Sequence, residues 1–298
     1  TVVDEIHCDY FINNGIRVIL PRQGETTENR ISTSNLCWQS YGIREFKDVF
    51  LTQTPDNRCA KMYALLDVAN GHMPAVINTT IEAKAKYGDM LVLMVGNIAN
   101  PETFRELSKA GADYIRVGIG NGGGCLTTQQ TGIGYPMASL IAEIHEISQT
   151  IGNSAMIVAD GGFKKYSDII KALALGADYV MLGSIFNKAI ESCGDNYLWG
   201  KIKVNQKIAE FAYKHKIPVY KKFRGMSTKE VQKKWGKEVL TTSEGVIRFR
   251  KVEYRLAQWV ENFEAYLRSA MSYSNALTLD EFIGQAKIVR ITNNAYNR

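Results

Sequence analysis

Cys125 directly follows a glycine-rich run, residues 118–124, at the end of a predicted strand. Bare backbone lets N–H groups and carbonyls approach an ion or a phosphate closely, and a thiol placed there meets ligand. Such a thiol is a nucleophile if its pKa is lowered. The residues alone leave a small buried cysteine beside a flexible turn equally open. The remaining cysteines lack this setting: Cys8, Cys37, Cys59 and Cys193.

Two further turns, Asp160-Gly161-Gly162 and Gly183-Ser184, follow the next two predicted strands. Loops after the last two strands of a parallel barrel often bind phosphate through backbone amides and a short helix N-terminus. Asp160 is of the right type to accept hydrogen bonds from sugar hydroxyls. An Asp-Gly turn and a helix cap are the plainer interpretation. Because both turns stand where barrels often bind phosphate, the sequence favours a nucleotide pocket.

Short apolar runs that alternate with amphipathic stretches must position these residues. Continuously apolar strands alternating with helices indicate a parallel sheet covered on both faces. Because polar turns follow the strands, we expect an α/β (β/α)8 TIM barrel in a single domain, residues 1–298; a doubly wound open sheet is the alternative. Seven strands are predicted, and we expect the first strand of the barrel to lie upstream of Thr1, outside this chain. The seven predicted strands cover 17–20, 49–52, 63–66, 91–95, 114–117, 156–159 and 179–182, and helices are predicted over 101–110, 136–150 and 166–175.

Composition excludes several classes of protein. The 298 residues are 45% hydrophobic, which excludes disorder, and no apolar run approaches the roughly 18 residues of a membrane span. Five cysteines without a C-x-x-C pair indicate reduced thiols and a cytoplasmic protein. Basic residues give a net charge of +6 and gather only over 221–237. No recognition motif accompanies them, so a solvated face or anion-binding rim is favoured, with no nucleic-acid and no membrane partner.

Several motifs together resemble the GMP reductase and IMP dehydrogenase superfamily. The resemblance covers nearly the whole chain and is weakest over the first 60 residues. It implies a TIM barrel that acts on purine nucleotides. The motifs are the Gly118 to Pro136 run with Thr-Gly-Ile-Gly-Tyr-Pro at 131–136, Asp160-Gly161-Gly162, 171–178, Arg-Gly-Met-Ser at 224–227, 268–273 and 288–292.

Four features favour the reductase over the dehydrogenase. Leu-Asp-Val-Ala-Asn-Gly at 66–71 and the Thr-Gly-x-Gly-Tyr-Pro stretch are similar to reductase motifs. Only 17 residues separate Met226 from Glu244, whereas the dehydrogenase carries a longer mobile flap there. Between Leu20 and Val49 there is no room for the regulatory CBS domain pair that dehydrogenases insert.

The resemblance implies NADPH-dependent reductive deamination of GMP to IMP and ammonia. Cys125 would attack C2 of guanine and form a thioimidate, and NADPH would then deliver hydride to C2. A poor leaving group such as an amine needs a proton donor. The family gives that role to a threonine that matches Thr127, together with a glutamate that matches Glu244.

The resemblance also implies which residues of this sequence bind the ligands. For NADPH it implies Arg22, Asp67, Val68, Ala69, Ile119 and Gly120, with Ser269, Ala270, Met271 and Ser272 from a neighbouring subunit of a homotetramer; Arg22 would meet the 2′-phosphate. Carbonyls of Gly120, Gly122 and Cys125 would hold a monovalent metal ion, potassium. For GMP it implies Asp160, Gly161, Gly162, Gly183, Ser184, Gly225, Met226, Ser227, Ser243 and Gly245.

Some residues depart from the family pattern. Gly123 stands where the family has serine, and Thr128 and Thr241 stand where arginine is common. An insertion over 199–220, with a predicted helix at 202–215, is longer than the family norm. Two alternatives therefore stay open. One is an IMP dehydrogenase without its regulatory domain, and the other is a purine-nucleotide-binding scaffold that has lost catalysis.

Overall fold

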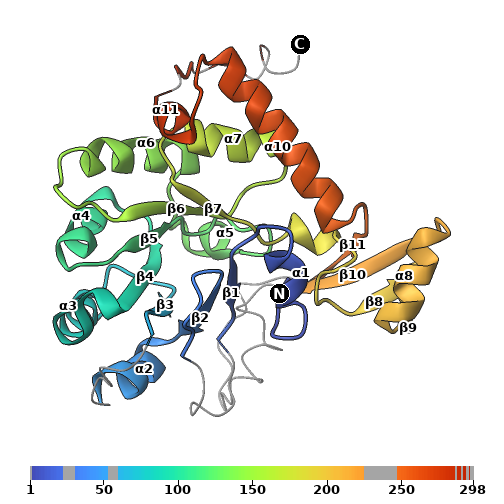
Figure 1. The fold of residues 1–298 in the computed structure, drawn as a ribbon, viewed down its shortest axis with the longest axis horizontal. Helices are drawn as coiled ribbons and strands as arrows, with labels where there is room; N and C mark the ends of the chain where they lie inside the picture. Colours follow the sequence, from blue (N-terminus) through green and yellow to red (C-terminus); the bar gives the residue numbers. More distant parts are fainter. Residues whose placement is uncertain are drawn as a thin grey trace.

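Seven parallel strands lie side by side in chain order in the computed structural model, which describes residues 2–22, 31–52, 60–224, 247–285, 287–289, 291–292 and 295. A doubly wound sheet would reverse its strand order at some point, and this sheet does not. The curled parallel sheet has the TIM-barrel fold, as predicted (Figure 1). Its strands are β1 Val18–Leu20, β2 Cys37–Tyr41, β3 Met62–Asp67, β4 Leu91–Ile98, β5 Tyr114–Val117, β6 Met156–Asp160 and β7 Tyr179–Met181.

The sheet curls until its two outermost strands approach one another. The guanidinium of Arg17, just before β1, lies 5.1 Å from the ring centre of Tyr179, the first residue of β7. Inside the curl, Trp38 packs edge-on against Tyr114, with 5.1 Å between ring centres. This interior cluster fills the space that the strands enclose, so the barrel is a packed core with its polar groups at the rims.

Helices cover the outer surface of the sheet (Figure 1). Two polar side chains stabilise helix starts: Asn100 accepts the Glu102 N–H at 2.8 Å, and Asp168 accepts the Lys164 N–H at 2.9 Å. No described helix is both long and apolar enough to cross a membrane. The helices are α1 Cys8–Ile12, α2 Ile43–Phe46, α3 Pro74–Tyr87, α4 Pro101–Lys109, α5 Thr127–Thr131, α6 Met137–Ser148, α7 Tyr166–Ala174, α10 Leu256–Tyr273 and α11 Leu279–Phe282, with short turns η2 Lys47–Leu51, η3 Gly88–Met90 and η4 Phe186–Lys188.

One of the seven predicted strands was misplaced. Residues 49–52 lie mostly in η2, a helical turn that buries Val49 and Phe50 on one side. The strand is instead β2, which includes the buried polar pair Gln39 and Ser40. A short apolar run does not distinguish a strand from a buried helical turn, and buried polar residues hide a strand from a hydrophobicity pattern.

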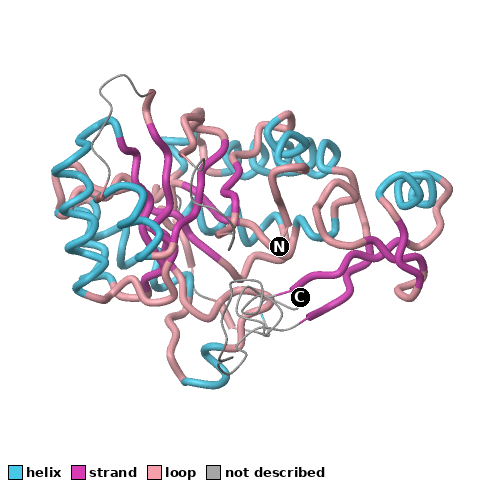
Figure 2. Tube along the Cα trace, turned by 90° about the horizontal axis from the view of Figure 1, so that it is seen from below, coloured by secondary structure: helices cyan, strands magenta, loops and turns pink. Residues whose placement is uncertain are grey.

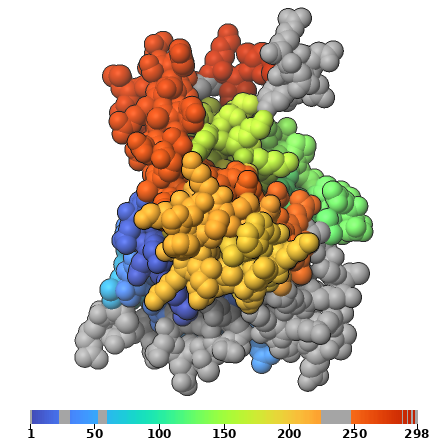
Figure 3. All heavy atoms as spheres, turned by 90° about the vertical axis from the view of Figure 1, so that its right-hand side faces the viewer, coloured from blue at the N-terminus to red at the C-terminus, as the bar shows by residue number. Residues whose placement is uncertain are grey.

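Residues 196–224 and 247–251 add a second, antiparallel sheet with the strand order β11-β10-β8-β9. We call this sheet and its helix the lobe; it projects from one side of the barrel in Figure 2 and faces the viewer in Figure 3. The predicted helix at 202–215 is wrong at its start, because 202–204 pair with β8 as a strand. The elements are β8 Asn196–Leu198, β9 Ile202–Val204, α8 Gln206–Lys214, β10 Val219–Arg224 and β11 Ile247–Lys251.

Candidate functional site

Four polar side chains meet at the carboxyl ends of β3 to β6. Arg116, from β5, donates to Asp67 Oδ1 and to Asn97 Oδ1, and its Nε lies 3.6 Å from Asp160 Oδ2. Asn97 Nδ2 donates to Asp160 Oδ2 at 2.8 Å and to the Gly118 carbonyl at 2.7 Å. Burial disfavours the charged form of Arg116, but the two carboxylates outweigh it and raise its pKa. The cluster is therefore a fixed cation between two anions.

Sequence reasoning found Asp67 and Asp160 and missed Asn97 and Arg116. A usable signal was present: Arg116 is a charged residue within a strand that is otherwise apolar and buried at Ile115 and Val117. A buried charge is rarely tolerated without a partner, so it should be paired with an acid at a neighbouring strand end. Asn97, at the end of the apolar β4, gave a weaker signal of the same kind.

The glycine-rich loop before Cys125 packs directly against the turn after Asp160. A methyl group added at Gly118 would lie 2.5 Å from the Asp160 carbonyl oxygen, and one added at Gly161 would lie 2.9 Å from Gly122 N. Both residues have positive φ, 123° and 95°, which also excludes most side chains. Glycine is required here because two backbones touch, and the contact brings the two predicted turns together.

Cys125 is partly exposed at this contact and carries a free thiol. The thiol donates to Thr127 Oγ1 at a distance of 3.1 Å, and the Cys125 N–H donates to the Gly122 carbonyl at 3.0 Å. Thr127 is the first residue of α5. The sulfur and a hydroxyl that can accept or donate a proton therefore lie side by side, which is the arrangement that nucleophilic attack with proton transfer needs.

Ser184 reaches the same loop from the end of β7. A methyl group at Gly123 would lie 3.0 Å from Ser184 Oγ, so the serine hydroxyl lies directly opposite the residue that departs from the family pattern. Thr128, the other departure in the described loop, is exposed, but its hydroxyl folds back on the loop: Oγ1 donates to the Ile133 carbonyl at 2.7 Å and lies against Gly120. The Thr128 hydroxyl therefore links two parts of the loop backbone.

The loop after β3 lies along the same edge. Val68 donates its N–H to the Gly96 carbonyl and accepts from Asn97 N, each at 2.8 Å, while Ala69 is exposed beside it. Arg22, just after β1, packs over Gly42 with its Nε 3.4 Å from Glu45 Oε2. These residues share one rim of the barrel with Ile119 and Gly120.

Other predicted residues are not part of this cluster within one chain. Ser269 to Ser272 lie near the end of α10, where Ala270 and Met271 pack with residues of α7 and Ser269 Oγ donates to the Ala265 carbonyl at 3.0 Å. A role for them in a neighbouring subunit stays a prediction. Six predicted residues lie outside the described residues: Gly225, Met226, Ser227, Ser243, Glu244 and Gly245.

The described residues contain no cluster of three or more His, Cys, Asp or Glu side chains that could hold a metal ion. The predicted potassium site would use main-chain carbonyls instead. Of these, the Gly122 carbonyl already accepts the Cys125 N–H. The carbonyl site at Gly120, Gly122 and Cys125 stays a prediction.

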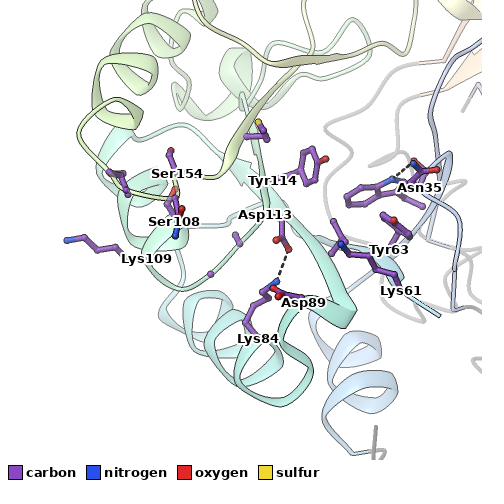
Figure 4. A pocket seen from close by; sticks show the side chains of 18 of the residues that line it. Asn35, Lys61, Tyr63, Lys84, Asp89, Ser108, Lys109, Asp113, Tyr114 and Ser154 are labelled. Carbon is purple, nitrogen blue, oxygen red and sulfur yellow. Dashed lines mark hydrogen bonds and ion pairs between the residues drawn. The ribbon is translucent and has the colours of Figure 1, made fainter. Parts of the chain in front are cut away.

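A pocket of about 800 Å³ lies at the opposite rim, at the amino ends of the strands (Figure 4). Two of its charged residues pair with each other: Lys84 Nζ lies 3.0 Å from Asp113 Oδ2 and donates to the Leu91 carbonyl at 2.9 Å. Figure 4 shows Lys84 and Asp113 turned toward each other between a helix and the sheet. At this rim the Lys84–Asp113 pair belongs to the hydrogen-bonded framework, and the predicted site residues lie at the carboxyl ends.

Fold and site together define a parallel-barrel protein whose candidate site residues follow the carboxyl ends of its strands. Residues 61–298 match the family model of the IMP dehydrogenase / GMP reductase domain, and the chain belongs to this family.

Relatives on both branches are similar to the chain. GMP reductase of Shouchella clausii is 32% identical over 100% of this chain and 84% of that protein. Inosine-5′-monophosphate dehydrogenase of Chlorobaculum tepidum is 33% identical over 76% of this chain, but the match spans only 45% of that protein. Among solved structures, a cysteine-to-alanine variant of Trypanosoma brucei GMP reductase in complex with guanosine 5′-monophosphate has a TM-score of 0.71 at 24% identity, covering 88% of this chain and 51% of that one. That likeness confirms the fold.

Proposed function

We propose that the protein is a GMP reductase, which converts GMP, NADPH and two protons into IMP, ammonium and NADP⁺. The observation that carries this proposal is the Cys125–Thr127 pair, 3.1 Å apart, at the contact between the glycine-rich loop and the Asp160 turn. GMP reductases that align over the full length of the chain support it.

Asp160 would accept hydrogen bonds from the ribose hydroxyls of GMP. Its Oδ2 is held by Asn97 and lies near Arg116, so the carboxylate is oriented before substrate binds. Gly161, Gly162, Gly183 and Ser184 would surround the phosphate. The hydroxyl of Ser184 lies opposite Gly123 and can supply the contact that the family's serine provides. The base would be lined by Gly225, Met226, Ser227, Ser243 and Gly245.

The Cys125 sulfur would form a bond to C2 of guanine, and the C2–N bond would break as the amino group leaves as ammonia. The departing nitrogen needs a proton, which Thr127 would relay together with Glu244. Thr127 fits this role because its hydroxyl already contacts the sulfur. When bound, NADPH supplies the hydride that C2 accepts. The C–S bond then breaks, which returns the thiolate and releases IMP.

The rim residues Arg22, Asp67, Val68, Ala69, Ile119 and Gly120 would hold NADPH. They fit such a ligand because glycine and small side chains lie beside the fixed charges of Asp67 and Arg116. Arg22 would bind the 2′-phosphate in competition with Glu45, its present partner. Residues 269–272 of a neighbouring subunit in a homotetramer, and potassium on the loop carbonyls, complete the proposal. The free thiols of the described cysteines are consistent with a cytoplasmic protein.

The test follows the loss of absorbance from reduced cofactor when GMP and NADPH are mixed with the protein. We expect turnover by the wild type and none by Cys125→Ala. Cys8→Ala, which removes a free thiol at the first residue of α1, should keep wild-type rates and is the matched control. A wild type that is inactive with GMP and with related guanine nucleotides would instead favour the inactive nucleotide-binding scaffold.

The second candidate is an IMP dehydrogenase, favoured by the 33% identity with the Chlorobaculum tepidum enzyme. Both reactions would use the same cysteine, so the Cys125 variant does not separate them. Mixing the protein with IMP and NAD does, because the dehydrogenase would generate NADH. We expect no NADH in that assay.

A further inference from the structure

One face of the lobe's antiparallel sheet carries three aromatic rings and three lysines. Strand register places directly opposite residues on the same face, and the pairs Tyr197 with Tyr220, Tyr220 with Lys251, Tyr197 with Lys203 and Lys222 with Phe249 are opposite. We call this set the open sheet face: Tyr197, Lys203, Tyr220, Lys222, Phe249 and Lys251.

Helix α8 covers the other face of the same sheet. Ala209 and Ala212 of α8 pack in one cluster with Val219, and with Leu198 and Val204 at its margin. Figure 2 shows α8 along one side of these strands. Lys221 also points away from the open sheet face: it is fully buried and donates to the carbonyls of Ser192 and Gly194. The two faces therefore differ, because one is a packed core and the other meets solvent.

Two of the aromatic rings on the open sheet face, those of Tyr197 and Phe249, contact each other across β10. Tyr197 and Phe249 come from strands on either side of β10, and their ring centres are 5.1 Å apart at 87°. Phe249 is 49% exposed, and Tyr197 and Tyr220 are partly exposed. Contiguous exposed rings are uncommon on a surface that only meets water, and they indicate a surface that binds something.

The lobe also concentrates positive charge. Residues 195–223 and 247–253 contain ten Lys and Arg against three Asp and Glu, a larger excess than the net +6 of the whole chain. On the open sheet face the Lys203 side chain is 62% exposed and pairs with Asp195 at 3.0 Å, and Lys251 is exposed. The expected occupant of this face is therefore a polyanion.

We propose that the open sheet face binds a single-stranded nucleic acid. Unpaired bases stack on exposed rings, with about 1 to 3 kcal/mol per base, while cations beside the rings neutralise the phosphates. An acidic peptide would pair with the lysines but has no flat groups for three adjacent rings. The bases of a duplex are stacked on each other and cannot reach the rings.

Nucleic-acid binding at this face is the opposite of the expectation from the sequence, which was that the protein has no nucleic-acid partner. Along the chain the six residues are spread from 197 to 251, and no recognition motif joins them. Pairing of β8, β9, β10 and β11 gathers them on one surface. The inference does not depend on the proposed reductase activity, because it uses none of the residues placed in the catalytic or nucleotide-binding machinery.

The test is fluorescence anisotropy of the full chain with labelled oligo(dT) and oligo(U) of about 20 nucleotides, at several salt concentrations. Tyr197→Ala/Phe249→Ala should weaken binding by about tenfold or more. Phe211→Ala, which removes a 62% exposed ring on α8, is the matched control and should change affinity less than about twofold. Thermal melting of each variant checks that the lobe is folded.

A second pair of variants tests charge without touching the rings. Lys203→Gln/Lys251→Gln should weaken binding and flatten its salt dependence, whereas Lys207→Gln/Lys214→Gln on α8 should not. The proposal is overturned if no binding occurs at micromolar protein, or if both lysine pairs act equally. It is also overturned if duplex DNA, heparin or phosphatidylserine vesicles bind at least as tightly as the oligonucleotides.

Discussion

The two rims of the barrel use the same residue, aspartate, in different ways. At the amino ends, Gly-Ala-Asp-Tyr occurs twice, at 111–114 and 176–179. In each copy the carboxylate accepts a backbone N–H from the preceding strand at 2.7 Å: Asp113 from Leu93, and Asp178 from Ile157. At the carboxyl ends, Asp67 and Asp160 instead contact side chains from other strands.

This contrast indicates which rim of the barrel can hold reactive groups. A carboxylate that satisfies a backbone donor at the start of a strand is part of the hydrogen-bonded framework, and its loss leaves a buried donor unpaired. A carboxylate held by Arg116 and Asn97 is oriented but lies in a rim built of glycine loops. We therefore expect loss of an amino-rim aspartate to lower stability and loss of a carboxyl-rim aspartate to lower activity, whereas loss of Arg116, which joins two carboxylates, should lower both.

Arg116→Met should have the largest effect, because it removes the cation that joins the two carboxylates. Breaking a buried charge cluster from one side costs about 3 to 5 kcal/mol. Chemical denaturation should show this loss, and GMP turnover should fall with it. A variant with wild-type stability would contradict the view that Arg116 holds the carboxyl rim together.

A paired comparison of aspartates tests the contrast directly. Asp113→Ala should lower the free energy of unfolding by about 1.5 to 3 kcal/mol, since Leu93 N and Lys84 lose a charged acceptor. Its activity per folded molecule should not change. Asp160→Ala should lower kcat/KM for GMP by about 100-fold, equal to roughly 3 kcal/mol. Denaturation curves and initial rates measure both, and equal behaviour at the two rims would refute the contrast.

Gly123 and Ser184 offer a smaller test within the carboxyl rim. Gly123→Ser would crowd the Ser184 hydroxyl, which a new Cβ would approach to 3.0 Å, and should weaken GMP binding by about 1 kcal/mol. Adding Ser184→Gly removes the crowding and should restore affinity. Isothermal titration of the two single variants and the double variant gives the coupling energy. Additive effects would mean that the two residues do not share one position.

The smallest expected effect is a dependence of stability on pH, which arises from Asp178. Burial raises the pKa of Asp178 above its ordinary value of 3.8, even though the Ile157 N–H acts in the opposite direction. The folded protein therefore binds this proton more tightly than the unfolded chain. Its contribution to stability is complete below about pH 3.8 and is lost as the pH rises through the raised pKa. The stability of the wild type relative to Asp178→Asn should thus grow on acidification, as denaturation at several pH values would measure.

Much of the fold was predictable because its signals are local. Apolar runs at 91–95 and 114–117 became β4 and β5, and Pro101 marks the start of α4. These signals failed where polar residues are buried or where an apolar run is not a strand. Gln39 and Ser40 are buried in β2, so the strand was missed, and the apolar run at 49–51 proved to be a helical turn.

Neighbouring residues are enough to predict the glycine-rich loop, the Asp160 turn and the barrel, because glycine requirements and strand–helix alternation are local features. The folded chain was needed to show that Arg116 joins Asp67 to Asp160 and that six residues of the lobe share one face. Those choices depend on which strands lie side by side. A side chain's partners are set by strand pairing and register, which bring together residues far apart in the chain.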